Sequence, residues 1–306
     1  MMREPSPQAL HLSFEPGPYR MAMGLVTCSR SEWIELDERY VEELTLRRDL
    51  LARRRDEVFA AAPGSERARR ETWDVLAAHL AEQWPDWFAR EGRGLVNRFT
   101  GESWNLCDPG RDPLEAAAML VQEDLCLIEL GPQGPVLTAG VVCFPSRWRL
   151  GEKLGRPLTA VHGPVPFYGE RLARPVDRFM NLVKPGHVSV RLNWSVLDDP
   201  ALFQPTGKFR TDRSDHITAE NAGDTLYVRV ERQTLTRLPT SGAVLFTIRV
   251  HVYPLARIAA RPEIAARLAE AVRALPPPTV HYKSLLRFRE PLLAYLVGRE
   301  TSIASI

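Results

Sequence analysis

The sequence has few cysteines, and their spacing rules out the usual cysteine-based metal sites. Cys28, Cys107, Cys126 and Cys143 lie far apart and form no C-x-x-C pair, so we interpret them as reduced cysteines of the core. The glycine patterns of dinucleotide-binding and phosphate-binding loops are also missing. By recognisable motif, the chain itself therefore carries no NADPH, flavin or iron–sulfur site.

Long hydrophobic runs and blocks of one charge are missing as well. No apolar run reaches the roughly 18 residues that suggest a membrane span, and the N-terminus lacks the apolar core of a secretion signal. Forty basic side chains nearly balance 38 acidic ones, which argues against a nucleic-acid partner. We therefore expect a cytoplasmic protein that binds neither membrane nor nucleic acid. The arginine clusters between residues 47 and 70 fit solvated helix faces, with a docking surface for an acidic partner as the alternative.

Apolar spacing divides the 306 residues into three parts. With 44% apolar residues, the chain can bury a sizeable core. Helical spacing over 37–61 and 65–84, and a third helix beginning at Asp112-Pro113, predict an N-terminal arm with helices over residues 1–122. A core over 123–254 and C-terminal helices over 255–306 follow, packed together as one compact unit.

The core region predicts an antiparallel sheet. Residues 125–130 and 136–144 flank a Gly-Pro-Gln-Gly turn and predict a hairpin. Short helical segments follow over 147–183. Three strands then follow, over 187–197, 224–234 and 243–253, before helices over 262–274 and 282–297. This order resembles that of a PAS domain. It predicts an α+β fold: a five-stranded antiparallel sheet with helices on one face, a ligand pocket between them, and N- and C-terminal helical extensions.

Charged residues interrupt the apolar ladder of the strand at 227–234. Alternation places Val228, Val230 and Arg232 on one face, and Arg229, Glu231 and Gln233 on the other. An arginine on an apolar face needs an anionic or hydrogen-bonding partner. Arg232 is therefore either a hook for a ligand or half of a structural salt bridge, and the usual pairing of buried charges within a protein favours the salt bridge.

Several sequence blocks resemble one known family. They are residues 143–166, 190–195 and 230–235, together with the strand at 245–250. These blocks resemble the haem-dependent oxidative N-demethylase alpha-subunit family, and the resemblance covers most of residues 10–298. It implies a PAS-like domain that binds haem b and oxidises a small amine such as dimethylamine with O2. It also implies a separate reductase subunit carrying NADPH, FMN and a 2Fe–2S cluster, and a subunit that binds tetrahydrofolate and accepts the formaldehyde unit.

The resemblance also suggests residues for the haem iron. His162 ends a short helical segment between the two halves of the sheet, where haem PAS domains carry their proximal histidine. A neutral imidazole there would hold the iron from one side. A histidine that only caps a helix is the alternative, and His187, at the start of a strand, is the second choice as ligand.

The remaining assignments concern the haem edge and the distal side. Arg232 would bind iron-bound oxygen or a propionate, and Glu231 would accept the ammonium hydrogens of the substrate, although the two point to opposite faces and cannot line one cavity without a bulge. Arginine forks match carboxylates, so further cofactor contacts are expected from Arg147, Arg149, Arg191 and the hydroxyl of Tyr168.

Two other functions suit the same sequence. The first is a haem sensor or binding protein without turnover, and the second is a haem-free relative that keeps the fold for assembly. Sensor PAS domains usually feed an effector module, and none is visible here. The enzyme is therefore the favoured hypothesis.

Overall fold

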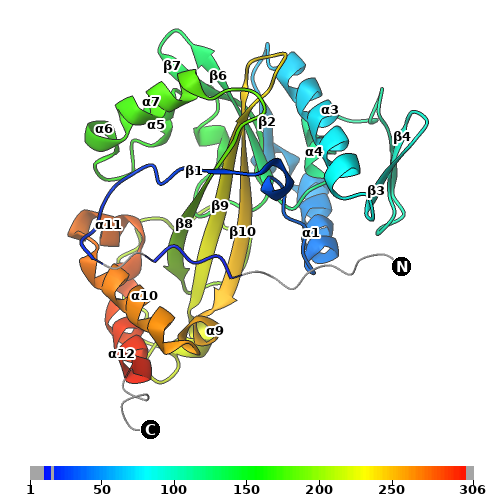
Figure 1. Cartoon of the computed structure of the whole chain (residues 1–306). Helices are drawn as coiled ribbons and strands as arrows, with labels where there is room; N and C mark the ends of the chain where they lie inside the picture. The colour runs from blue at the N-terminus through cyan, green and yellow to red at the C-terminus, as the bar shows by residue number, and fades with distance from the viewer. Residues whose placement is uncertain (1–9, 15–16, 301–306) are drawn as a thin grey trace.

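The computed structural model describes residues 10–14 and 17–300, and a long antiparallel sheet runs through its centre (Figure 1). In this part of the chain the sheet has seven strands in the order β1-β8-β9-β10-β6-β7-β2. The predicted hairpin is β6 and β7, and the three predicted later strands are β8, β9 and β10. Their bounds are Asp124–Gly131, Gly134–Val141, Val188–Leu197, Tyr227–Arg237 and Val244–Pro254.

The expected five strands are contiguous in this sheet, but the predicted strand number is wrong. β1 (Val26–Cys28) pairs with β8, and β2 (Phe59–Ala61) pairs with β7, so each edge gains one strand. Each of these two strands has only three residues, which is too short for a period-two alternation to be recognised in the sequence.

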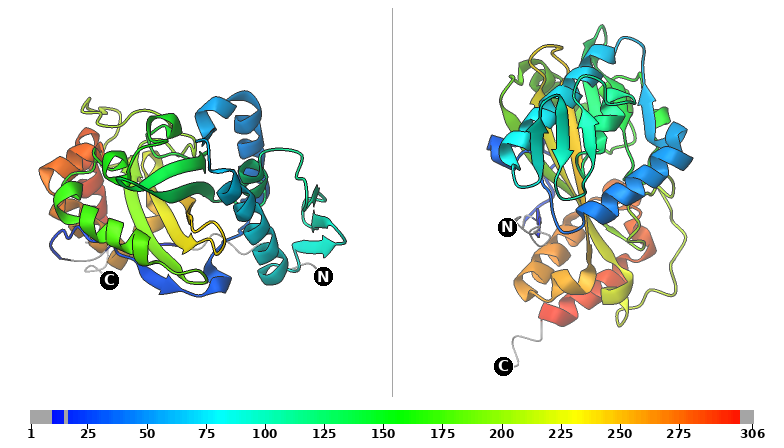
Figure 2. Two further views of the ribbon diagram at one scale, coloured as in Figure 1. Left: turned by 90° about the horizontal axis from the view of Figure 1, so that it is seen from above. Right: turned by 90° about the vertical axis from the view of Figure 1, so that its right-hand side faces the viewer.

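The prediction that helices cover one face of the sheet is also wrong, because both faces are covered (Figure 2). Alternate residues of β6 show this arrangement. Leu125 and Leu127 belong to the core formed with the N-terminal helices, whereas Ile128 packs with Leu158 and Met180 on the opposite face. A strand buried on both faces is apolar at successive positions, as the run at 125–128 is.

The N-terminal helices form the layer on the first face. They are α1 (Tyr40–Arg53), α2 (Arg55–Val58), α3 (Glu66–Gln83) and α4 (Pro113–Ala118). α4 begins where its sequence predicted, because the Asp112 carboxylate accepts a hydrogen bond from the backbone N–H of Leu114 at 2.9 Å. The helix predicted over 37–61 ends earlier, since residues 59–61 form β2.

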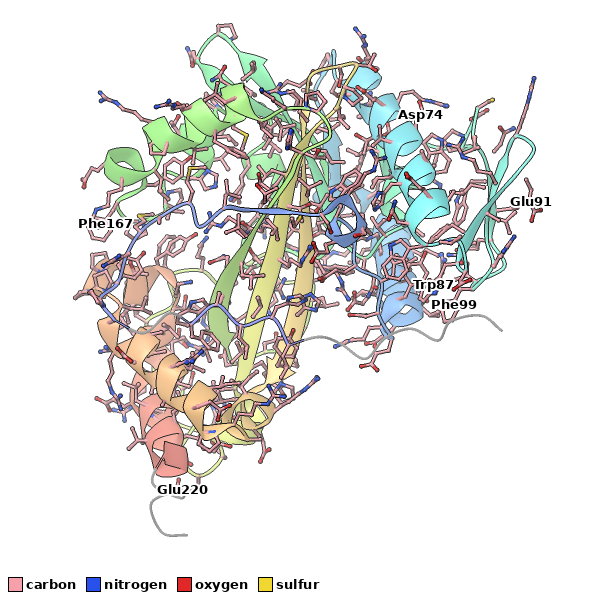
Figure 3. All side chains as sticks on the ribbon, viewed as in Figure 1. Asp74, Trp87, Glu91, Phe99, Phe167 and Glu220 are labelled. Atoms are coloured by element: carbon pink, nitrogen blue, oxygen red, sulfur yellow. The ribbon has the colours of Figure 1, made fainter. Side chains whose placement is uncertain are left out.

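A second, three-stranded sheet lies outside this layer and was not predicted. It comprises β3 (Phe88–Glu91), β4 (Gly94–Asn97) and β5 (Ser103–Asn105). The rings of Trp87 and Phe99 stack at its base, with centroids 4.4 Å apart (Figure 3).

The helices that cover the second face are short. They are α5 (Leu158–Val161), α6 (Tyr168–Arg171) and α7 (Ala173–Leu182). At one end of the sheet, α8 (Ala222–Thr225), α9 (Leu255–Ala259), α10 (Pro262–Ala274), α11 (Pro277–Tyr282) and α12 (Arg289–Glu300) form a separate group with a core of its own. None of the helices in the described ranges is long and apolar enough to cross a bilayer.

Candidate functional site

A cavity of about 1600 Å³ lies against the sheet, lined by the short helices α5 to α7, by the N-terminal arm and by α11. Its apolar wall comes from both layers and includes Ile128, Leu158, Phe179, Met180, Leu235 and Phe246. Residues 190–195 of β8 all line the cavity. Because successive strand residues point to opposite faces, the cavity extends around this strand to the space beneath the N-terminal arm.

One carboxylate faces α5 to α7 from the middle of the sheet. The register pairs Asn193 with Glu231 and Arg191 with Gln233, so these four side chains share a face. Alternation had predicted the shared face of Glu231 and Gln233. Glu231 Oε2 accepts hydrogen bonds from the Gln233 amide at 2.8 Å and the Asn193 amide at 3.2 Å. Two amides from neighbouring strands therefore fix the orientation of this carboxylate at the cavity wall.

Arg232 lies on the other face and is held by the protein itself. Its Nε is 3.0 Å from Glu35 Oε1, and its terminal nitrogens donate to the backbone carbonyls of Trp33 and Glu32. Its side chain is 6% exposed and reaches only the part of the cavity beneath the arm. The salt bridge that the sequence favoured for Arg232 is present in the structure, and Arg232 also lines the cavity.

His162 ends α5 and faces the cavity with one nitrogen already committed. Its Nδ1 lies 2.8 Å from the carbonyl oxygen of Leu158, and its ring stacks on Tyr168 with centroids 4.5 Å apart. Burial lowers the pKa of His162 to about 4, so the imidazole is neutral near pH 7. With the proton on Nδ1, Nε2 carries the lone pair that a metal requires.

Several buried polar atoms of the cavity lining have no hydrogen-bond partner among the described residues, and two of these lie on the His162 side of the sheet. These two are the hydroxyl of Tyr168 and Nε of Arg191. Burial raises the pKa of Tyr168 to about 12, so this hydroxyl remains a donor. Buried donors without partners are uncommon and costly, and both would be satisfied by an anionic group of a ligand.

Three lysines add positive charge to the same cavity. Lys208 Nζ donates to the hydroxyl of Tyr282 at 3.0 Å, and Lys283 Nζ donates to the carbonyl of Trp194. Burial lowers the pKa of Lys208 and of Lys283 to about 8, and it also lowers the pKa of Lys153. The cavity is thus suited to a ligand with an apolar body and negatively charged groups.

The other predicted residues lie at or outside the margin of the cavity. Arg147 Nη2 bonds Asp198 at 2.8 Å, while its buried Nη1 has no partner among the described residues. Arg149 and His187 are exposed and do not line the cavity, so the geometry gives neither of them a role there. Cys107 is also exposed, which corrects its assignment to the core.

Backbone strain is concentrated around the cavity. Arg147, Phe209 and Ser284 have positive φ angles of 60°, 61° and 56°, and all three line the cavity. Such left-handed conformations of non-glycine residues are found most often near functional sites.

The lysines of the cavity were not predicted from the sequence. Lys208 lies in a polar loop, and Lys153 and Lys283 lie in short helical or turn segments. A single lysine in such a segment is normally solvated, so the sequence gives no signal that these three side chains converge on one cavity.

The fold and the site define an α+β protein with a large, positively charged ligand cavity against an antiparallel sheet. The family described as haem-dependent oxidative N-demethylase, alpha subunit-like, matches residues 24–293, and the chain belongs to this family. The resemblance stated from the sequence blocks is thereby confirmed. The family description supports a haem-dependent oxidoreductase that works with other subunits.

Proposed function

We propose that the cavity holds haem b, with His162 as the axial ligand of the iron. The observation that carries this proposal is the state of His162, whose Nδ1 bonds the Leu158 carbonyl and whose Nε2 has no hydrogen bond to any described residue. Proximal ligands of this kind are held by a hydrogen bond from the second nitrogen to a backbone carbonyl or carboxylate. The contiguous strand order β7-β6-β10-β9-β8 supports the PAS-like core proposed from the sequence.

The chemistry of the cavity fits this cofactor. The apolar wall between the sheet and α5 to α7 suits a porphyrin. The whole cavity, which also extends beneath the N-terminal arm, has about 1600 Å³, more than the roughly 300–1,000 Å³ of typical small-molecule pockets. Arg191 and Tyr168 offer unpartnered donors, so we assign the propionates to them. Lys208 and Lys283 supply further positive charge, whereas Arg147 contributes one nitrogen from the margin.

We further propose that the reaction is the oxidative N-demethylation of a small secondary amine such as dimethylamine. Haem, when bound, supplies the activation of O2. Glu231 accepts hydrogen bonds from the substrate ammonium, because its carboxylate faces the cavity and is held in place by Asn193 and Gln233. Substrate, O2, two electrons and two protons yield a primary amine, formaldehyde and water.

The proposed reaction needs a source of electrons and an acceptor for formaldehyde, and we assign both to partner subunits. The chain has no motif for NADPH, FMN or a 2Fe–2S cluster, and the description of the family as alpha subunit-like supports a larger assembly. We propose a reductase subunit that carries these three cofactors and a subunit whose tetrahydrofolate accepts the formaldehyde unit.

Amine-dependent consumption of NADPH and O2 tests the activity. The haem-loaded chain is combined with a matching reductase, and dimethylamine and related methylamines are supplied while formaldehyde is measured. Glu231→Gln keeps the shape but removes the charge, so we expect kcat/KM to fall by about 10- to 150-fold, which corresponds to the loss of a charged hydrogen bond.

Glu129→Gln is the matched control, since Glu129 also lies on a central strand but does not line the cavity. Its kcat/KM should equal that of the wild type. A haem-loaded protein that turns over no methylamine would instead support the sensor function, and a protein that binds no haem would support the haem-free relative.

A further inference from the structure

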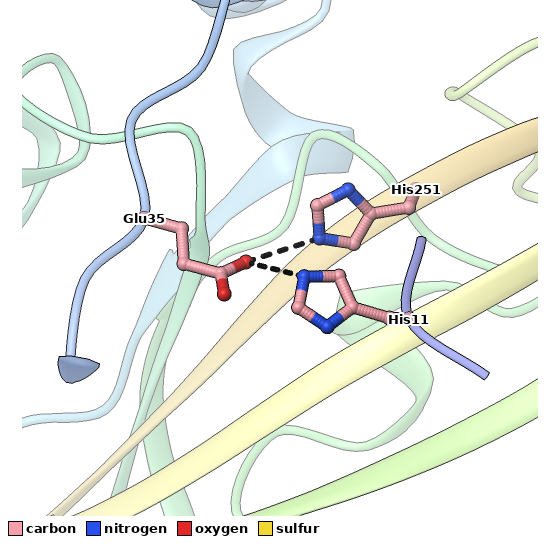
Figure 4. Close-up of side chains that lie close together, drawn as sticks. All are labelled: His11, Glu35 and His251. Atoms are coloured by element: carbon pink, nitrogen blue, oxygen red, sulfur yellow. Dashed lines mark hydrogen bonds and ion pairs between the residues drawn. The ribbon is translucent and has the colours of Figure 1, made fainter. Parts of the chain in front are cut away.

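We propose that His11, Glu35 and His251 form a second metal site, for a divalent transition ion such as Zn²⁺, on the sheet face opposite His162. The Nε2 atoms of His11 and His251 lie 3.1 and 3.2 Å from the same oxygen, Oε2 of Glu35 (Figure 4). The three ligand atoms lie within 4.8 Å of one another. Zinc–nitrogen and zinc–oxygen bonds of about 2.0–2.2 Å place neighbouring ligands roughly 3.0–3.5 Å apart.

Hydrogen bonding alone does not account for this cluster. The buried Nε2 of His11 makes no hydrogen bond to any described residue, although it lies 3.1 Å from the carboxylate oxygen. The His251 side chain is only 2% exposed, and its Nε2 uses that same oxygen. Nε2 of His11 is close to the carboxylate oxygen but poorly aligned for a hydrogen bond. Such an arrangement is expected where ligand atoms point toward a metal ion between them.

The surroundings of the cluster hold the Glu35 carboxylate and the backbone of Glu35 and His11. Arg232 binds Oε1 of Glu35 at 3.0 Å and thereby leaves Oε2 for the ion. The backbone N–H of Glu35 donates to Glu123 at 3.0 Å, and that of His11 donates to the hydroxyl of Tyr253 at 3.2 Å. The contact with Arg232 is an outer partner of the kind that orients metal-ligating carboxylates.

The local charge also favours a cation. Three further buried carboxylates lie close by, those of Asp37, Glu43 and Glu123. Arg249 binds the first two, each at 2.7 Å, whereas Oε2 of Glu123 is buried and has no hydrogen-bond partner among the described residues.

The position of the site joins the N-terminal arm to the sheet. His11 comes from the N-terminal arm, Glu35 from the segment before α1, and His251 from β10. An ion at this point would fasten the arm across the sheet. Two imidazoles and one carboxylate suit Zn²⁺, which also accepts water as a fourth ligand.

Metal binding by the full-length, haem-loaded chain without a histidine tag tests the proposal. After treatment with a chelator, equilibrium dialysis against Zn²⁺ measures stoichiometry and affinity, and the visible spectrum with Co²⁺ reports the ligand geometry. We expect one tightly bound equivalent in the wild type. His11→Gln should weaken it by more than about 100-fold, beyond the range seen for outer partners of a metal site, and Zn²⁺ should raise Tm in the wild type but not in this variant.

His187→Gln is the matched control, because His187 is exposed and far from the cluster in the sheet; it should bind Zn²⁺ as the wild type does. His251→Gln serves as a second variant, with circular dichroism to check its folding. His162→Ala tests haem binding and should leave the Zn²⁺ affinity unchanged, so the two proposals fail separately. A wild type without a stoichiometric ion, or a His11→Gln protein of equal affinity, would overturn the metal site.

Discussion

Replacing Arg191 by methionine should weaken haem binding strongly. Arg191 lies on the cavity face of β8, and its Nε is buried without a hydrogen-bond partner among the described residues. If a haem propionate accepts a hydrogen bond from the Arg191 guanidinium, the substitution removes a charged hydrogen bond worth about 1.5–3 kcal/mol. The dissociation constant for haem should then rise by about 10- to 150-fold.

Titration with haem, followed by the Soret absorbance, measures this constant. Arg149→Met is the matched control, because Arg149 belongs to the same set of predicted propionate partners but is exposed and outside the cavity. Its haem affinity should equal that of the wild type. Tyr168→Phe removes one neutral donor and should cost about 2- to 10-fold. An Arg191→Met protein that binds haem as tightly as the wild type, or an Arg149→Met protein weakened as much, would contradict the role of Arg191.

Three further predictions concern charge and stability. Arg249→Met leaves the buried carboxylates of Asp37 and Glu43 without their arginine, so denaturant unfolding should show a loss of about 3–5 kcal/mol; an unchanged midpoint would contradict this. Lys208 and Lys283, with pKa values near 8, are charged below that pH, so haem affinity should be full below pH 8 and fall as the pH rises above it; a flat profile would exclude their role. Burial lowers the pKa of His79 from its ordinary value to about 4, so its contribution to stability is full above pH 6.5 and is lost as the pH falls to 4. His79→Phe should recover up to about 3 kcal/mol at acid pH, and equal pH profiles of the two proteins would argue against it.

Much of the fold could be predicted from local patterns, because its central strands are long and their alternation is clear. The same alternation correctly separated Glu231 from Arg232. It could not show which residues cover each face, since that depends on packing. Helices α5 to α7 cover the face of Glu231. On the other face, Glu35 binds Arg232 although almost 200 residues separate the two in the sequence. Edge strands of three residues are too short to show an alternating pattern in the sequence. Single lysines that meet only in the folded protein show no sequence pattern either.

The residues of the proposed metal site could not be predicted from the sequence either. His11, Glu35 and His251 are isolated in the sequence, with none of the short spacings that mark a metal motif. Their ligand atoms meet only because the N-terminal arm crosses the sheet and reaches β10. Side-chain clusters assembled from three distant segments become visible only once the chain is folded.

The absorption spectrum of His162→Gly, reconstituted with haem and recorded with and without free imidazole, shows whether His162 holds the haem iron. The Nε2 of His162 is proposed to hold the iron, so the variant should lose the spectrum of the wild type and regain it when imidazole fills the vacated space. A variant whose ferric and ferrous spectra match the wild type without imidazole would show that another residue holds the iron.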